Sequence, residues 1–228
     1  MSSKLAVVTG TLGQLGPIWC RTLEGMGYRI FGIDQPLWDV ADRDQMHYAA
    51  SRCYAIHGAP EVVLLNAAID NPPGSDAKFF GNMERILAVN LLGANYVAEA
   101  FIPRMIENGG GVIIGIVSIM GRIGADWRNY PDGFEKPCAY GQSKAALEAM
   151  SRQITVQYGR YGIRACCIGF GPFDGGKLDP VFIGKFLRNV PVGRPVSEAS
   201  VAAALRFAVE CPEFAGQTAL IDGGYTIL

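Results

Sequence analysis

TGTLGQLGP, the segment from Thr9 to Pro17, places glycine at every third position between a short apolar run and an amphipathic stretch. Glycine lets the chain turn tightly and lets backbone N–H groups approach a phosphate, and the next helix adds free N–H groups and a positive dipole end. Pro17 suits the first helical turn, where its missing N–H costs nothing. The segment predicts a strand–turn–helix unit that can hold a pyrophosphate, although an ordinary βα turn can use the same glycines. The residues expected at the phosphates are Gly10, Thr11, Leu12, Gly13, Gln14, Leu15 and Gly16.

Beyond this turn, nearly continuous apolar runs alternate with helix-like stretches along the chain. Such runs are typical of strands covered on both faces, and their alternation with helices indicates parallel βαβ units. We therefore expect an α/β fold with a doubly wound, mostly parallel sheet (a Rossmann fold) in three αβα layers, built as a single domain over residues 1–228. The expected strands are KLAVVTG, YRIFGID, EVVLLNAA, GGVIIGIVS, IRACCIGF and QTALIDGG, and the expected helices are PIWCRTLEGMG, residues 81–108, AALEAMSRQITVQYGRYG and SVAAALRFAVE.

The composition narrows the functional class. Half of the 228 residues are hydrophobic, and 20 basic against 21 acidic residues give a formal net charge of −1. This balance provides no electrostatic footprint for nucleic acid or for an anionic membrane, so neither partner is expected. No apolar run appears long enough in the sequence to span a bilayer, and the N-terminal run is too short for a signal peptide, so we expect a cytoplasmic location.

The six cysteines do not indicate a metal site. None forms a C-x-x-C pair, and zinc-ligand spacing is absent, with only His47 and His57 available to assist. Cys166 and Cys167 lie inside an apolar run and are expected to be buried as small hydrophobic side chains.

The second apolar run ends in Asp34, where a Rossmann unit places the acid that accepts hydrogen bonds from the adenosine ribose hydroxyls. A carboxylate at this position would repel the 2′-phosphate of NADP. No Arg or Lys stands in the glycine turn or directly after Asp34 to neutralise that phosphate. The predicted cofactor is therefore NAD. The alternative is that Asp34 only caps the next turn.

A series of short motifs continues this pattern in order: DV at Asp39–Val40, LNAA at Leu65–Ala68, VNLLG at Val89–Gly93, IVS ending in Ser118, Tyr140-x-x-x-Lys144, and IDGG at Ile221–Gly224. Each motif alone is weak evidence. Together with the glycine turn and Asp34 they form an ordered set, and on that set the chain resembles the short-chain dehydrogenase/reductase family over nearly its whole length.

The resemblance implies roles for matching residues. Asn90 would hold a water in a proton relay, and Ser118 would hydrogen-bond the substrate oxygen. Tyr140 would be the acid/base, and Lys144 would bind the nicotinamide ribose and lower the pKa of the tyrosine. Further cofactor contacts are expected from Asp39 and Val40 at the adenine, from Asn66, Ala67 and Ala68 along the cleft, from Tyr140 and Lys144, and from Gly171 and Phe173 after the fifth strand.

These residue types suit hydride transfer at a carbinol carbon. The reaction moves a proton to or from oxygen, and free tyrosine titrates near pH 10, too high for an efficient base at neutral pH. A nearby ammonium and a positive nicotinamide ring both favour the phenolate. One helical turn places Lys144 on the same face as Tyr140, and the cofactor carries the hydride.

Four departures from the family pattern bear on the prediction. The glycine spacing is GxxGxxG rather than GxxxGxG, which is closer to the sugar-nucleotide-modifying branch. Asp34 and Asp39 stand too close for the usual helix between them, so that helix is expected to be missing, with Trp38 or Pro36 partly covering the adenine. Phe170-Gly171 replaces the usual Pro-Gly.

The fourth departure is the interval between Ser118 and Tyr140, which is wider than usual. The irregular stretch 120–138 within it is interpreted as a substrate-side flap, and the loop 171–180 as a second ligand loop. In the flap, Arg128 could meet a phosphate or carboxylate. The alternative is that Arg128 is a solvated charge and Trp127 a packing anchor.

The leading hypothesis is an oxidoreductase that uses NAD with a secondary alcohol or ketone of a small polar molecule, possibly a sugar or sugar nucleotide. One alternative is an epimerase or dehydratase of sugar nucleotides that retains its NAD, which the glycine spacing favours and the short C-terminal part disfavours. Another is a non-catalytic, cofactor-binding scaffold. A homodimer or homotetramer is expected, paired through the helices at 81–108 and 140–159 and through the apolar C-terminal tail.

Overall fold

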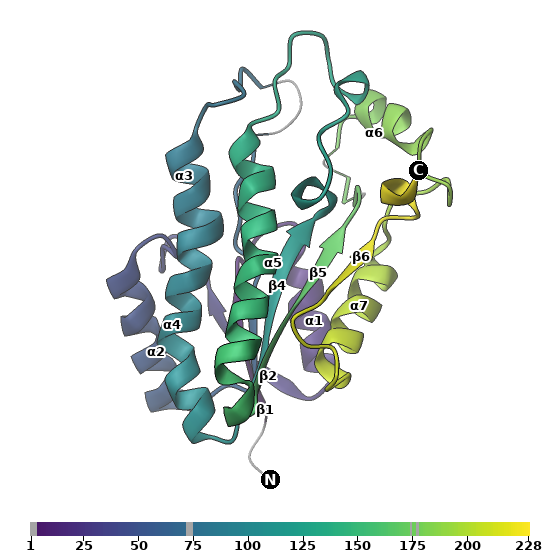
Figure 1. Cartoon of the computed structure of the whole chain (residues 1–228). Coiled ribbons are helices and arrows are strands. Elements are labelled where there is room, and N and C mark those ends of the chain that lie inside the picture. The colour runs from purple at the N-terminus through teal and green to yellow at the C-terminus, as the bar shows by residue number, and fades with distance from the viewer. Residues whose placement is uncertain (1–3, 72–74, 174, 177) are drawn as a thin grey trace.

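The computed structural model describes residues 4–71, 75–173, 175–176 and 178–228, which form one six-stranded sheet (Figure 1). All neighbouring strands pair in parallel, in the order β2-β1-β3-β4-β5-β6. The predicted doubly wound parallel sheet is confirmed. The strands are β1 (Lys4–Thr9), β2 (Tyr28–Ile33), β3 (Val62–Leu65), β4 (Gly111–Ser118), β5 (Ile163–Phe170) and β6 (Thr218–Ile221).

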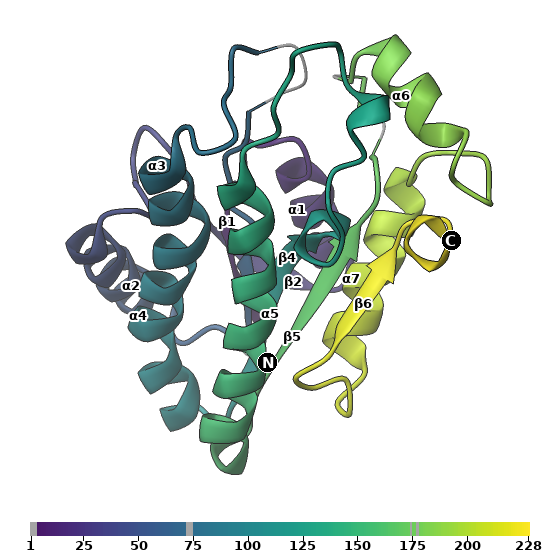
Figure 2. The ribbon, with the colours of Figure 1, turned by 45° about the horizontal axis from the view of Figure 1, so that its top comes forward.

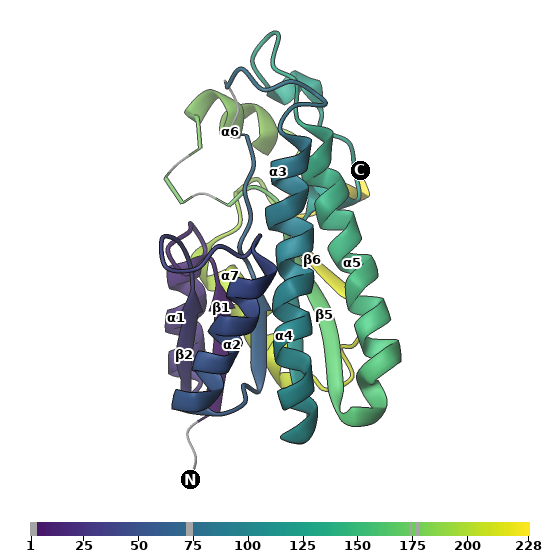
Figure 3. The same cartoon turned by 90° about the vertical axis from the view of Figure 1, so that its left-hand side faces the viewer.

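Helices cover both faces of this sheet (Figures 1 and 3). On one face, α1 (Gly16–Gly25) packs with α7 (Glu198–Glu210). On the other face lie α2 (Arg43–His57), α4 (Gly93–Glu107) and α5 (Cys138–Tyr158). Each face has its own apolar core, so the three αβα layers follow from burying both sides of every central strand.

The burial of the strands explains their apolar sequences. Every residue of β3 is buried, and so are six of the eight residues of β4. The edge strands β2 and β6 are only partly buried. Continuous apolar runs therefore mark the strands that have helices on both faces and neighbours on both sides.

Several helices begin at side-chain caps. Asp42 accepts a hydrogen bond from the Gln45 N–H at the start of α2, at 3.0 Å. Ser197 does the same for Ser200 at the start of α7. At α6 (Pro180–Leu187), Asp179 accepts from the two N–H groups of Val181 and Phe182. Such caps satisfy N–H groups that have no partner inside the helix.

The helix expected over residues 81–108 is a composite. It consists of α3 (Met83–Leu87), a π-helical segment (Ala88–Leu92) and α4, which the ribbon shows as one continuous rod (Figure 3). By length and composition alone, Met83–Glu107 would pass as a membrane span, contrary to the sequence-based expectation, but 56% of its apolar window is buried inside the fold. Packing against the sheet accounts for its apolar character.

Two helices were not predicted from the sequence. Helix α2 buries only Met46, Ala49, Ala50 and Cys53, a stripe of mostly small side chains. Helix α6 has eight residues and buries Phe182 and Phe186, one turn apart. The expected lack of a helix between Asp34 and Asp39 is confirmed, because those residues form a turn and α2 begins at Arg43.

Candidate active site

A cavity of about 530 Å³ opens at the carboxyl ends of the strands, the end that Figure 2 turns towards the viewer. It begins at the glycine turn after β1 and extends past the ends of β2 and β3 to the start of α5. Strands β1 and β3 are neighbours in the sheet, and the connections leave them in opposite directions. Ligands of open α/β sheets bind at such a switch point.

The glycine turn folds tightly enough to require glycine. Gly10 has φ +69°, and a Cβ on it would lie 2.9 Å from the Ala67 Cα. A Cβ on Gly16 would lie 2.3 Å from the Thr11 carbonyl oxygen. Leu15, the N-cap of α1, offers no side-chain acceptor to the free N–H groups of the first turn. Backbone donors at this end of the cavity fit the pyrophosphate of a dinucleotide.

Within that turn, the predicted phosphate-binding residues divide into two groups. Gly10, Gly13, Gln14 and Leu15 line the cavity. Thr11, Leu12 and Gly16 do not appear in its wall: the side chain of Thr11 packs over Gly32, Leu12 is largely exposed, and Gly16 is buried under the turn.

Asp34 lies at the carboxyl end of β2 in the same wall. Its carboxylate accepts hydrogen bonds from the N–H groups of Leu12, at 2.6 Å, and Gln35, at 2.8 Å. Asp34 therefore braces the glycine turn and caps its own turn, and it also faces the cavity. Both sequence-based interpretations of Asp34 describe part of its surroundings.

Beside it, Asp39 and Val40 also line the cavity, with Trp38 from the predicted covering pair; Pro36 does not appear in the wall. The carboxylate of Asp39 lies 3.5 Å from the guanidinium of Arg85, a basic residue of the cavity wall that sequence reasoning missed. The sequence does not indicate this contact, because Arg85 lies on α3, far along the chain from Asp39.

Asn66 ties the end of β3 to the glycine turn. Its side-chain amide donates to the carbonyl oxygens of Thr9 and Gly10, both at 2.9 Å, and its oxygen accepts from the Trp19 indole N–H at 2.8 Å. Asn66 lines the cavity together with Ala67 and Ala68, as predicted from the motif order.

Tyr140, Lys144 and Ser118 meet at the other end of the cavity. Helix α5 presents the first two on one face, with the Lys144 ammonium 5.6 Å from the centroid of the Tyr140 ring. Lys144 is 3% exposed and donates to the Ile116 carbonyl oxygen at 2.8 Å. Ser118 ends β4, and its hydroxyl accepts from the Met120 N–H at 3.2 Å. The i, i+4 spacing thus produces the predicted cluster.

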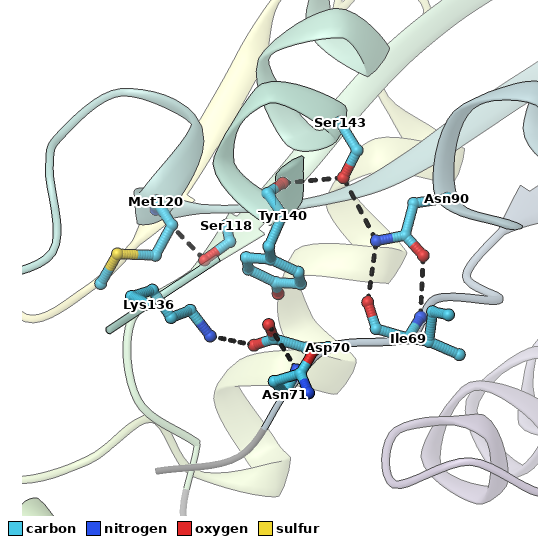
Figure 4. Close-up of polar contacts among 9 residues, drawn as sticks. All are labelled: Ile69, Asp70, Asn71, Asn90, Ser118, Met120, Lys136, Tyr140 and Ser143. Atoms are coloured by element: carbon cyan, nitrogen blue, oxygen red, sulfur yellow. Dashed lines mark hydrogen bonds and ion pairs between the residues drawn. The ribbon is translucent and has the colours of Figure 1, made fainter. Parts of the chain in front are cut away.

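Asn90, the fourth residue predicted to be catalytic, lies behind this cluster. It is 1% exposed, sits in the π-helical segment and does not appear in the cavity wall. Its amide donates to the Ile69 carbonyl oxygen at 2.9 Å and to the Ser143 hydroxyl at 3.2 Å, and its oxygen accepts from the Ile69 N–H (Figure 4). In this structure Asn90 holds the backbone after β3.

Comparisons with known proteins agree with this arrangement. A family model described as enoyl-(acyl carrier protein) reductase, within the short-chain dehydrogenase/reductases, matches residues 36–226. The chain belongs to the short-chain dehydrogenase/reductase family. This places it among the oxidoreductases that use NAD or NADP.

A relative in this family is the cis-4-hydroxycyclohexanecarboxylate dehydrogenase of Sinomonas cyclohexanicum. It is 26% identical, and the alignment covers 97% of this chain and 86% of the relative. A gluconate 5-dehydrogenase of Burkholderia cenocepacia J2315, solved with NADP and tartrate, superposes with a TM-score of 0.85 at 24% identity, covering 100% of this chain and 97% of its own. A short-chain dehydrogenase of Leptospira borgpetersenii, solved with NAD⁺, reaches 0.86 at 22%, covering 99% and 94%. The two structures share the fold.

In this short-chain dehydrogenase/reductase site, burial and nearby charges shift the pKa values of Tyr140 and Lys144. Burial raises the pKa of the Tyr140 phenol, the Asp70 carboxylate raises it further, and the hydrogen bond with Ser118 lowers it. Burial lowers the pKa of Lys144 to about 8. The net shift of the Tyr140 pKa is upward in the protein alone because desolvation disfavours the phenolate, and the effect expected of Lys144 stays a prediction.

The loop after β5 supplies Gly171 and Phe173 to the cavity wall, as predicted. Gly171 donates its N–H to the Ile221 carbonyl oxygen, which ties the loop to β6. Phe173 makes an isolated bridge with Val196. Asp174 and Lys177 of the same predicted ligand loop lie outside the described residues.

The flap over residues 120–138 agrees with the expectation of a solvated Arg128 but not with that of Trp127 as a packing anchor. Trp127 is 79% exposed and is no packing anchor, and Arg128 is paired with Asp126 and largely exposed. Tyr130 is the buried aromatic residue of the flap, stacked on Phe134 and packed against Phe182 of α6. The rings of Tyr130, Phe182 and Phe186 form an apolar wall of the cavity.

Sequence reasoning also missed Asp70 and Lys136, a charged pair in the wall beside Tyr140. Two features of the sequence could have indicated these residues: Asp70 follows β3, and Lys136 lies inside the predicted flap. No group of three or more His, Cys, Asp or Glu residues in the described parts of the chain could hold a metal ion. Cys166 and Cys167 are buried, as predicted.

Proposed function

We propose that this short-chain dehydrogenase/reductase transfers a hydride between NAD(H) and a secondary alcohol or ketone of a small polar substrate. The observation that carries the proposal is the cavity itself. It joins a phosphate-binding glycine turn and Asp34 at one end to Tyr140, Lys144 and Ser118 at the other. A dinucleotide lying along this cavity would bring its nicotinamide to the tyrosine.

Each of these residues has a separate role in the proposed reaction. The N–H groups at the start of α1 bind the pyrophosphate, and Asp34 accepts from the ribose hydroxyls. When bound, the cofactor accepts the hydride from the carbinol carbon or returns it. Tyr140 takes the hydroxyl proton during oxidation and gives it back during reduction. Ser118 orients the substrate oxygen, and Lys144 holds the nicotinamide ribose while its charge favours the phenolate.

A test of the catalytic proposal is Tyr140→Phe. Loss of the proton acceptor should lower kcat for oxidation of a secondary alcohol by about 10²- to 10⁴-fold or more, while NADH affinity, followed by fluorescence, stays nearly unchanged. Tyr158→Phe on the same helix is the matched control and should keep full activity. Full activity in Tyr140→Phe would refute the mechanism.

The preference for NAD is a separate part of the proposal. Asp34 would repel a 2′-phosphate, so NADH should bind about tenfold or more tightly than NADPH in a fluorescence titration. Arg85 is the basic residue of the cavity wall able to oppose this effect, although Asp39 already pairs with it. Tighter binding of NADPH that is lost in Arg85→Ala would assign the chain to NADP.

A further inference from the structure

One ion pair in the cavity has no part in the mechanism above. The Lys136 ammonium pairs with the Asp70 carboxylate (Figure 4), and both residues line the cavity beside Tyr140. The ammonium lies 4.7 Å from the centroid of the Tyr140 ring. The Lys136 side chain is 14% exposed and the Asp70 side chain 30%, so the pair is partly shielded from solvent. Both charges face the cavity beside Tyr140 and are available to a substrate.

Both partners are held in place from behind. Asn90 brackets the peptide groups of Ile69, the residue before Asp70, with two hydrogen bonds. On the flap, the Glu135 carboxylate accepts from the Phe79 N–H at 2.9 Å, and the Cys138 N–H donates to the Phe79 carbonyl oxygen. These contacts position Lys136 between two anchored neighbours. A pre-organised pair of this kind is suited to recognition.

The pair retains hydrogen-bonding capacity. A carboxylate has about four lone-pair sites and an ammonium three donors. Asp70 accepts from its neighbour Asn71, at 2.8 Å, and from Lys136. Lys136 directs one N–H to Asp70. Acceptor and donor capacity therefore remain side by side, which is what one hydroxyl, itself both donor and acceptor, requires.

We propose that Asp70 and Lys136 bind a second hydroxyl of the substrate, on the carbon next to the reacting one, so that the substrate class is a neutral polyhydroxylated alcohol or its hydroxyketone. This inference rests on the proposed function. Asp70 and Lys136 are then specificity-determining residues that touch substrate, while Tyr140, Lys144 and Ser118 act on the reacting oxygen.

The charge balance favours a neutral substituent. A carboxylate on Lys136 would have to displace or crowd Asp70, whose own negative charge would repel it. A hydroxyl adds hydrogen bonds to both charges and leaves their pairing intact. Tyr130, Phe182 and Phe186 also line the cavity and provide an apolar surface for the carbon skeleton.

The test compares three four-carbon secondary alcohols with NAD: 2-butanol, 2,3-butanediol and 3-hydroxybutanoate. The wild-type protein should oxidise the diol with a kcat/KM roughly 10- to 100-fold above that of 2-butanol, as expected for hydrogen bonds to charged groups. The hydroxy acid should be the poorest of the three. In Asp70→Leu/Lys136→Met, which removes both charges together, the ratio of kcat/KM for the diol to kcat/KM for 2-butanol should fall to about 1.

Controls separate recognition from structure. Lys136→Arg keeps the charge and donors and should keep the diol preference. Lys78→Met removes an exposed lysine that lies before α3 and outside the flap, so it should have no effect. An equal loss for all three alcohols in the double variant would mean that the pair only holds the flap, and would overturn the inference. So would a wild-type preference for 3-hydroxybutanoate, or equal rates for 2-butanol and the diol; both leave the proposed dehydrogenase function standing. Oxidation of none of the three despite NADH binding would count against both.

Discussion

At the scale of the residue, the pKa of Tyr140 depends on its burial and on the charges around it. In the proposed mechanism its phenol loses a proton near neutral pH, whereas burial and the Asp70 carboxylate both raise its pKa. The positive groups nearby are Lys144 and Lys136, with ammonium nitrogens 5.6 Å and 4.7 Å from the ring centroid. Because each acts in a wall that is largely shielded from water, its effect on the phenolate is larger than it would be in water. The protonation of Tyr140 therefore depends on the charges that the fold gathers around it.

Asn90 connects the π-helical segment to the loop after β3, through two hydrogen bonds with Ile69. Replacing it with Ala would leave the peptide groups of Ile69 unpaired in a buried place, at a cost of about 1–3 kcal/mol in the free energy of unfolding. The loop that carries Asp70 would also lose its support, so kcat should fall. Urea denaturation and alcohol oxidation by the same preparation measure the two effects.

The matched control is Asn95→Ala, because Asn95 lies on the same helix and donates only to the exposed Leu91 carbonyl oxygen. Its free energy of unfolding should change by less than about 0.5 kcal/mol. Equal effects of the two alanine variants would contradict the supporting role assigned to Asn90.

At the scale of the element, the π-helical segment Ala88–Leu92 explains why Asn90 faces inward at this place. A π segment inserts one extra residue in a turn and shifts the side chains that follow relative to a regular helix. Buried Val89 and Asn90 lie inside the segment, and α4 resumes at Gly93, whose missing Cβ lets Val40 approach closely. Local hydrophobic spacing indicates a helix here but does not reveal its widened turn.

Helix α5 is held to the end of β4 by an ion pair. Arg122, just past β4, donates three hydrogen bonds to Glu148, which is 7% exposed and one turn beyond Lys144. Arg122→Met would leave this buried carboxylate unpaired and should lower the free energy of unfolding by about 2 kcal/mol. Chemical denaturation measures the change.

The comparison for that variant is Arg21→Met. Arg21 pairs with Glu198 between two exposed side chains, and such pairs contribute less than about 1 kcal/mol. If Arg21→Met lowered the free energy of unfolding as much as Arg122→Met, burial of Glu148 would not explain the importance of the Arg122–Glu148 pair.

At the scale of the whole molecule, exposed apolar side chains on two helices bear on assembly. The predicted pairing uses the outer faces of the composite helix and of α5, where Val156 is 84% exposed and Leu92 44%. Exposed apolar side chains on a helix face favour association. We expect light scattering to give the mass of a dimer or tetramer, and Val156→Glu to shift it towards the monomer. A monomeric wild-type protein would refute this prediction.

Membership of the short-chain dehydrogenase/reductase family and the parallel αβα architecture were both predictable from the sequence. Signals such as the glycine turn, the i, i+4 tyrosine and lysine, and the continuous apolar runs are local, because each depends on backbone sterics or on burial of a single element. Helix α2 was missed because its buried stripe consists mostly of small side chains, and α6 because it has only eight residues.

Only the tertiary structure brought Asp70 and Lys136 together, 66 residues apart in the chain, and placed Arg85 against Asp39. It also turned Asn90 towards Ile69 rather than into the cavity, and it determined the net effect of burial on the pKa of Tyr140. The physical reason is common to all four. Charge pairing and desolvation depend on distances across the fold, which residue spacing does not contain, whereas turns and strands depend on neighbours in the chain.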